Sequence, residues 1–150
     1  IFRVADAFLV EKIYLTGFTG YPPLLQNDPR PPHIQAHALN EIQKTAINLL
    51  PFIPWEYQED PIPLLKKLKK IHYQIISVEQ TKESANFTQA DYKFPLVLIF
   101  GHERLGVDEL LLDLSDLVIQ IPMLGMGNSH NVAMSAGIVL SEIVGHHLTQ

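Results

Sequence analysis

The polar residues best suited to chemistry lie in two short segments of the second half of the sequence. Residues 101–106 read Gly-His-Glu-Arg-Leu-Gly and directly follow a continuous apolar run at residues 96–100. Residues 125–131 read Gly-Met-Gly-Asn-Ser-His-Asn and precede an apolar stretch that begins at Val132. Open α/β sheets bind ligands in loops that follow the carboxyl ends of strands, and a helix start adds free backbone N–H groups. Both segments are therefore candidate ligand-binding loops.

Each segment also has a purely structural interpretation. Gly101 could relieve crowding where a strand turns into a helix, and Glu103 could favour the N-terminus of that helix. Ser129 or Asn131 could cap the helix that begins at Val132, because both side chains accept hydrogen bonds from free N–H groups. Residue types alone leave both interpretations open for each segment.

Several familiar catalytic and metal-binding patterns are missing from the sequence. The first loop is not GxGxxG and no Gly-Lys-Ser/Thr occurs, which argues against dinucleotide-binding and P-loop sites. Ser129 and His130 are adjacent and rarely face each other, and G-x-S-x-G is absent, which argues against a hydrolase. His33 and His37 stand four apart without the glutamate of H-E-x-x-H, so we expect no metal site.

The composition predicts a single compact domain. The chain has 150 residues, of which 47% are hydrophobic, enough for a self-supporting core. No apolar run reaches the roughly 20 residues of a membrane span, so we expect no membrane association. Zero cysteines exclude disulfides and thiolate chemistry and suit a cytoplasmic protein. Sixteen acidic against eleven basic residues argue against non-specific nucleic-acid binding, so any RNA contact requires a local patch.

Hydrophobic periodicity predicts strands that alternate with helices. The expected strands are residues 10–15, 73–78, 96–100 and 117–121, with a short extended piece at 55–57. The expected helices are residues 2–9, 33–50, 64–71, 107–114 and 132–144, while residues 79–93 read as irregular. This alternation indicates an α/β fold with a mostly parallel sheet flanked by helices, in which the run at 96–100 is covered on both faces. The proline-rich stretch at 21–32 could be a functional lid or a disordered segment.

The two candidate loops and their surroundings resemble a known protein family. Residues 100–106, 121–123 and 128–133 resemble the second and third motifs of the SpoU (TrmH-like) RNA ribose methyltransferases of the SPOUT class. The order, the spacing and the flanking apolar strands of these motifs all agree with that family. Residues 1–8 and 13–17 resemble the rear half of its first motif.

The resemblance covers nearly the whole chain and has two departures. Residues 43–46 and 54–55 resemble the segment that follows the first motif in the family. The asparagine that normally precedes the arginine matching Arg3 is not in this sequence, so we expect a first strand to precede Ile1. His130 stands where the family often has leucine, which leaves Ser129 and Asn131 of the motif intact.

The resemblance implies a specific fold and assembly. It implies one SPOUT methyltransferase domain over residues 1–150, with a C-terminal deep trefoil knot in which the last segment threads through a loop. It also implies a homodimer with the active site near the interface. Sequence rules would not have proposed a knot, since true knots are rare exceptions.

The cofactor implied by the resemblance is S-adenosylmethionine, a methyl donor held in the knot by backbone groups. Six positions carry over to its binding site: Val78, Glu79, Gly101, Ile121, Met123 and Ser129. They match the candidate loops at strand ends described above.

The reaction implied is transfer of a methyl group from the donor to a ribose 2′-hydroxyl of RNA. Its catalytic residues would be Arg3, Glu103, Ser129 and Asn131. The family proposal makes the arginine the base, but a guanidinium stays protonated in proteins, so we expect Arg3 at least partly to clamp phosphate and orient the hydroxyl. Glu103 would position polar groups, and Ser129 and Asn131 would order the loop.

The implied substrate is RNA, and the short single domain favours tRNA over rRNA. Two other functions remain open at this point. A relative of this fold could methylate a base rather than a ribose. A non-catalytic RNA-binding or dimerisation module is the other alternative, because the chain is acidic and carries no dedicated RNA-binding appendage.

Overall fold

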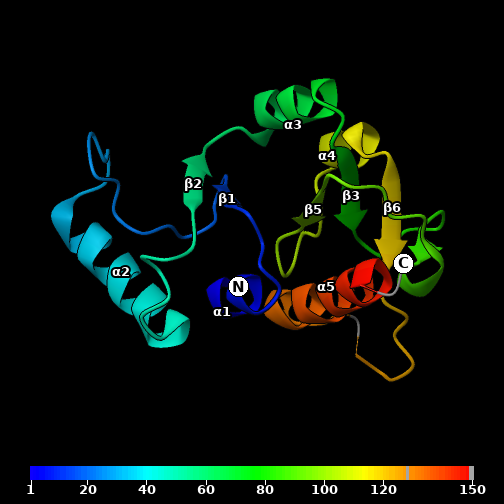
Figure 1. Ribbon diagram of the computed structural model, residues 1–150. Coiled ribbons are helices and arrows are strands. Elements are labelled where there is room, and N and C mark those ends of the chain that lie inside the picture. Colours follow the sequence, from blue (N-terminus) through cyan, green and yellow to red (C-terminus); the bar gives the residue numbers. More distant parts are fainter. Residues whose placement is uncertain (128, 149–150) are drawn as a thin grey trace. The chain divides into compact units, whose positions relative to one another are not determined.

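The computed structural model describes residues 1–127 and 129–148 and divides the chain into two compact units, Ile1–Pro61 and Ile62–Gln150. Each unit contains parallel strands and helices, which confirms the predicted α/β class (Figure 1). Asn128, part of the third predicted motif, lies outside the described residues. The expectation of one domain stays a prediction. Among the described residues, no helix combines the length and apolar character that crossing a membrane requires.

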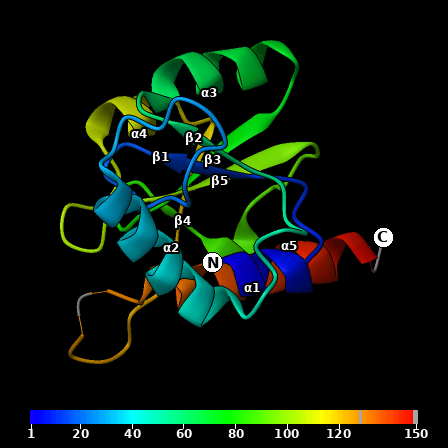
Figure 2. The same cartoon turned by 90° about the vertical axis from the view of Figure 1, so that its left-hand side faces the viewer.

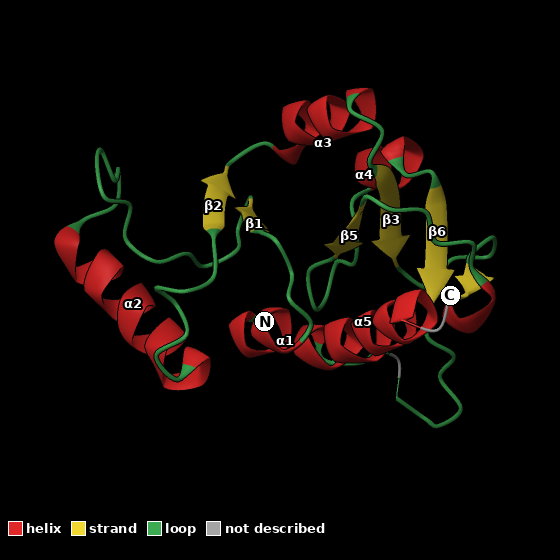
Figure 3. Ribbon diagram, in the orientation of Figure 1, coloured by secondary structure: helices red, strands yellow, loops and turns green. Residues whose placement is uncertain are grey.

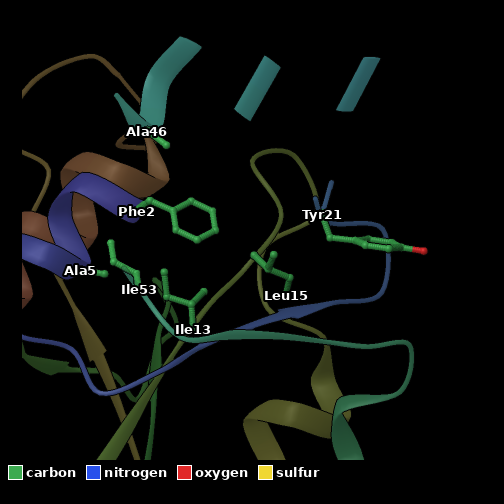
Figure 4. Packing of buried hydrophobic residues seen from close by; sticks show 7 residues of the cluster. All are labelled: Phe2, Ala5, Ile13, Leu15, Tyr21, Ala46 and Ile53. Atoms are coloured by element: carbon green, nitrogen blue, oxygen red, sulfur yellow. The ribbon is translucent and has the colours of Figure 1, made fainter. Parts of the chain in front are cut away.

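The first unit is a two-stranded parallel sheet with two helices. Its elements are α1 (Phe2–Ala7), β1 (Ile13–Thr16), α2 (Pro32–Ala46) and β2 (Trp55–Gln58). Its buried core consists of Phe2, Ala5, Ile13, Leu15, Tyr21, Ala46 and Ile53. Figure 4 shows Phe2, Ile13 and Ile53 turned toward one another. The expected helix over 33–50 is too long, because Ile47 adopts a left-handed backbone with φ 47° and ends α2.

The proline-rich connection between β1 and α2, drawn as a long loop in Figure 3, is organised by an ion pair between Asp28 and Arg30. The Asp28 side chain, 4% exposed, accepts hydrogen bonds from the backbone N–H groups of Leu24 (2.9 Å) and Arg30 (3.0 Å). The Arg30 guanidinium donates to both Asp28 oxygens and lies 3.5 Å from the Tyr21 ring centroid. Tyr21 in turn stacks on Tyr57 at 3.7 Å between centroids. These contacts favour an ordered loop over the disordered alternative.

The second unit is a four-stranded parallel sheet with helices around it. Its elements are α3 (Pro61–Lys70), β3 (Gln74–Val78), β4 (Ala85–Asn86), the 3₁₀ turn η1 (Phe87–Gln89), β5 (Leu96–Phe100), α4 (Glu109–Leu114), β6 (Leu117–Gln120) and α5 (Val132–Leu148). The strand order is β4-β6-β3-β5. Figures 1 and 2 show α5 on the opposite side of these strands from α3 and α4.

The core of the second unit lies between the sheet and α5. Ile76 of β3 and Ile119 of β6 pack with Val139 and Ile143 of α5, and each of the four is at most 2% exposed. Ser77 of β3 is also fully buried, and its hydroxyl lies 2.7 Å from the hydroxyl of Ser115. The hydrogen bond between them satisfies polar atoms that burial would otherwise penalise.

Two expectations for the second unit are wrong, and the cover expected on both faces of the run at 96–100 is only partial. That run forms the edge strand β5, whose residues are all half-buried, whereas the fully buried residues lie on β3. The stretch at 79–93, expected to be irregular, contains β4 and η1. The strand β4 was missed because the two residues that pair with β6 are too few to give a periodic pattern in the sequence. The last helix does not end at 144 but continues to Leu148. The His146 and Glu142 side chains, 2.9 Å apart, bridge the turn that contains Gly145.

Replacing Asp28 by Asn is expected to remove a pH-dependent contribution to the free energy of unfolding. Hydrogen bonds from the Arg30 side chain hold the pKa of Asp28 well below its ordinary value of 3.8. The carboxylate therefore stabilises the folded chain above about pH 4, and this contribution is lost as the pH falls through the lowered pKa. Urea unfolding between pH 7 and pH 2 should show a wild-type advantage over Asp28→Asn that shrinks below about pH 4.

The exposed Asp6 of the same unit offers a matched control. Asp6→Asn should change the free energy of unfolding little across the same pH range, because the Asp6 side chain is exposed to solvent. A wild-type advantage over Asp28→Asn that does not change with pH would contradict the assigned role of Asp28.

Candidate functional site

The carboxyl ends of three strands of the second unit lie at one edge of the sheet. Val78, the last residue of β3, pairs with Phe100 of β5 on one side and with Ile119 of β6 on the other. The segments that follow these strands therefore leave the sheet side by side. They carry five of the six positions expected to bind the donor: Val78, Glu79, Gly101, Ile121 and Met123.

The loop after β5 closes on itself and requires glycine at its start. His102 and Gly106 form a pair of backbone hydrogen bonds of 3.0 and 2.8 Å. A Cβ at Gly101 would lie 2.1 Å from the carbonyl carbon of Gly106 and 2.3 Å from the nitrogen of Val107. Backbone atoms cannot yield at such distances, so any side chain at Gly101 would open the loop. Gly101 thus relieves crowding between two backbone segments that are in contact.

Gly106 belongs to the same site and was not among the predicted site residues. Its backbone is left-handed, with φ 71°, and a Cβ there would lie 2.4 Å from a carboxylate oxygen of Glu79. The second glycine of the segment 101–106 was the signal in the sequence. Nothing in the sequence connected it to Glu79.

Glu79 directs its carboxylate at this loop. One oxygen accepts a hydrogen bond from the backbone N–H of Val107 at 2.8 Å, and the other accepts from that of Gln80 at 2.8 Å. Glu103, by contrast, lies exposed in the turn of the loop. The two glutamates predicted for the site therefore differ: Glu79 is tied to the backbone, while Glu103 faces solvent.

The segment after β6 runs from half-buried to fully exposed residues. Ile121 and Met123 are half-buried, whereas Leu124 and Met126 have relative exposures of 98% and 102%. Ser129 is exposed as well. Leu124 and Met126 are thus large apolar side chains that lie fully open to solvent, which makes the segment a candidate contact surface.

Asn131 is the residue that caps the last helix. Its side-chain oxygen accepts hydrogen bonds from the backbone N–H groups of Ala133 (2.9 Å) and Met134 (3.4 Å). Its carbonyl oxygen accepts the first helical bond, from Ser135 at 2.9 Å. The capping interpretation therefore holds for Asn131. It assigns this side chain a structural role at the start of α5, whatever its part in catalysis.

His130 carries an unsatisfied polar atom beside this cap. Its Nε2 is buried and has no hydrogen-bond partner among the residues that the structure describes. A buried polar atom without a partner costs about 1–3 kcal/mol, which is recovered when a ligand or partner supplies the bond. The position is therefore suited to receive a polar group from outside the unit.

Arg3 belongs to the first unit, where it is an exposed residue of α1. Glu103, Ser129 and Asn131 belong to the second unit. The joint catalytic role expected for these four residues stays a prediction. Within residues 1–127 and 129–148, no group of three or more His, Asp or Glu side chains is placed to hold a metal ion.

Comparison with known proteins places these loops in a family. The sequence matches the SpoU rRNA Methylase family over residues 31–141, which include both candidate loops. The chain belongs to the SpoU rRNA methylase family. The resemblance seen in the sequence is thereby confirmed.

Two curated proteins that resemble this SpoU-family chain have the same name. A protein of Aquifex aeolicus, named tRNA (guanosine(18)-2′-O)-methyltransferase, is 39% identical over 87 residues, which are 58% of this chain and 41% of the relative. A protein of the same name from Escherichia coli K12 is 33% identical over 75 residues, 50% of this chain and 33% of the relative. The matched part of the chain thus corresponds to about two fifths or less of these relatives' length.

Solved structures show the same fold as this SpoU-family chain. The A. aeolicus TrmH/SpoU tRNA modifying enzyme aligns with a TM-score of 0.73 at 28% identity, covering 99% of this chain and 67% of the other. The AdoMet-bound rRNA methyltransferase of Sinorhizobium meliloti aligns with a TM-score of 0.72 at 24% identity, covering 97% and 49%. The second likeness concerns the fold alone.

Removing the cap of α5 should destabilise the SpoU-family chain without unfolding it. Asn131→Ala leaves helix N–H groups without an acceptor and is expected to lower the free energy of unfolding by about 1 kcal/mol. Asn131→Asp should retain most of this stability, because a carboxylate accepts the same bonds and suits a helix N-terminus. Urea unfolding monitored by circular dichroism measures both changes, with the exposed Ser129→Ala as control. An equal loss in Ser129→Ala would contradict the assignment of the cap.

Proposed function

We propose that this chain transfers a methyl group from S-adenosylmethionine to a ribose 2′-hydroxyl of tRNA. The observation that carries the proposal is the SpoU match over residues 31–141, whose motifs coincide with loops meeting at one edge of the sheet. The names of the curated relatives support ribose 2′-O-methylation and favour tRNA over rRNA as the acceptor. The S. meliloti structure with bound AdoMet supports the choice of donor.

The residues at the strand ends fit a donor of this kind. The tight crossing at Gly101 leaves this edge lined by backbone, and Val78, Ile121 and Met123 are half-buried apolar residues beside it. The buried Nε2 of His130, which has no hydrogen-bond partner within residues 1–127 and 129–148, adds a polar atom that a ligand can bond. An adenosine with a charged sulfonium tail combines an apolar ring face with hydrogen-bonding edges, which is the combination this lining can hold. Ser129 completes the proposed donor site.

The proposed chemistry assigns a task to each catalytic residue. As the oxygen–methyl bond forms and the sulfur–methyl bond breaks, a neutral thioether leaves without an acid and the hydroxyl proton passes to water, so the protein's part is to orient the ribose hydroxyl. Arg3 binds the neighbouring phosphate and orients the hydroxyl, since its guanidinium remains protonated. Glu103 positions polar partners, and Ser129 orders the loop whose end Asn131 fixes by capping α5.

The proposal extends to the fold and assembly that the family resemblance implies. We infer one SPOUT domain spanning both units, with a trefoil knot in its C-terminal part. We also infer a homodimer in which the exposed Leu124 and Met126 are covered. A cytoplasmic tRNA-modifying enzyme is the corresponding cellular role.

A labelling assay tests the proposed function directly. The chain is incubated with methyl-labelled S-adenosylmethionine and unmodified tRNA or rRNA, and the digested nucleosides are identified. We expect label in a 2′-O-methyl nucleoside from tRNA. Label in a methylated base would replace the proposal by base methylation. Failure to bind the donor would favour a non-catalytic RNA-binding module.

Replacing Arg3 should separate catalysis from donor binding. Arg3→Ala is expected to slow transfer by about 100-fold or more, because a reacting group misplaced by about 1 Å can cost on the order of 10²-fold. The Kd for S-adenosylmethionine should stay within about twofold of wild type, since the expected donor positions lie on other elements. Single-turnover assays and calorimetry measure the two quantities, with the exposed Lys44→Ala of the same unit as control. Parallel loss of donor binding and transfer would rule out this role.

A further inference from the structure

Glu79 connects the end of β3 with β6 and with the loop that follows β5. It directly follows β3, and its backbone N–H donates to the carbonyl of Ile119 in β6 at 2.9 Å. Its carboxylate accepts the N–H of Val107, at the end of the loop after β5, at 2.8 Å. One residue thus connects the ends of β3 and β6 and the loop at 101–107.

The same carboxylate determines the path of that loop by contact as well as by hydrogen bonding. Gly106 lies so close to Glu79 that a Cβ would come within 2.4 Å of its Oε2 and 3.1 Å of its Cδ. On the other side, Gly101 is in backbone contact with Gly106 and Val107. The left-handed φ of Gly106, 71°, turns the chain between these two contacts. The loop is therefore held between Gly101 and the Glu79 carboxylate.

The hydrogen bonds of Glu79 give its carboxylate a role in holding the backbone. Both of its oxygens accept backbone N–H groups, from Val107 and from Gln80, and Gly106 lies against Oε2. Bonds from N–H groups to an ionised carboxylate are about twice as strong as neutral ones. A carboxylate engaged in this way acts on the backbone that it holds.

We propose that Glu79 is a positioning residue that holds the loop at 101–107 in the shape that binds the methyl donor. This inference rests on the proposed function, and it assigns to Glu79 an action through the loop instead of contact with the donor. The site would then depend on the Glu79 side chain, which lies 22 residues before Gly101 in the sequence.

Hydrogen exchange and donor titration of the full chain test the proposal together. The variants are Glu79→Ala, which removes both acceptors, and Glu79→Gln, which keeps one acceptor oxygen. The matched control is Glu83→Gln, the same change at an exposed glutamate four positions further along. Exchange is followed without donor in the peptides that cover residues 101–107 and residues 74–78, and the Kd for S-adenosylmethionine is measured by calorimetry.

In Glu79→Ala we expect exchange in residues 102–107 to rise about tenfold, since a charge-assisted hydrogen bond protecting the loop is lost. Exchange in β3 should stay unchanged, and the Kd for S-adenosylmethionine should rise about tenfold or more. Glu79→Gln should lie between Glu79→Ala and wild type in both measurements, because its amide oxygen can still accept one N–H. Glu83→Gln should match wild type.

Three results would overturn the positioning role. Unchanged exchange with a raised Kd would make Glu79 a direct ligand of the donor. Faster exchange in β3 as well as in the loop would make it a general stabilising residue. Faster loop exchange with an unchanged Kd would separate the loop from donor binding. A wild-type chain that binds no donor would instead refute the proposed function, and the donor-free exchange data distinguish that case.

Discussion

Backbone pairing on both edges of β3 is the interaction on which the second unit depends. β3 bonds in parallel to β5 on one side and to β6 on the other, and its residues Ile75, Ile76 and Ser77 are completely buried. Because the strands are parallel and Val78 is in register with Phe100 and Ile119, all three chains emerge at one edge. The candidate site follows from this register, since a shift of one residue would reverse the faces of every side chain on the shifted strand.

Much of the second unit could be predicted because three of its strands are short segments rich in apolar and β-branched residues. The runs at 73–78 and 117–121 each match an observed strand to within one residue, and 96–100 matches without error. The sequence could not predict which strand is central. The edge strand β5, half-buried on both faces, has the same kind of apolar sequence as a fully buried strand. The two residues of β4 were also beyond prediction, because their strand character comes entirely from the hydrogen bonds to β6.

The site was predictable in its residue types and not in its contacts. The glycine at position 101 suggested that the chain is crowded there, and the residues around Asn131 suggested a helix cap. Both features depend on residues nearby in the sequence. The bond from Val107 to Glu79 joins residues 28 positions apart, so no local rule could indicate it. Gly106 was missed for the same reason, as the atom that it must avoid belongs to Glu79. The role of Glu79 is therefore a property of the sheet's register.

The construction of this site suits the chemistry proposed for it. Methyl transfer from a sulfonium needs no acid for its leaving group, so its rate depends mainly on how well the two reactants are aligned. Alignment requires a rigid backbone, and here rigidity comes from a glycine crossing, a closed loop and a carboxylate bound to N–H groups. A hydrolase would instead need a nucleophile and a base in hydrogen-bond contact. A site whose charged group is engaged in holding its own backbone is built for orientation, which is the contribution that methyl transfer requires from the protein.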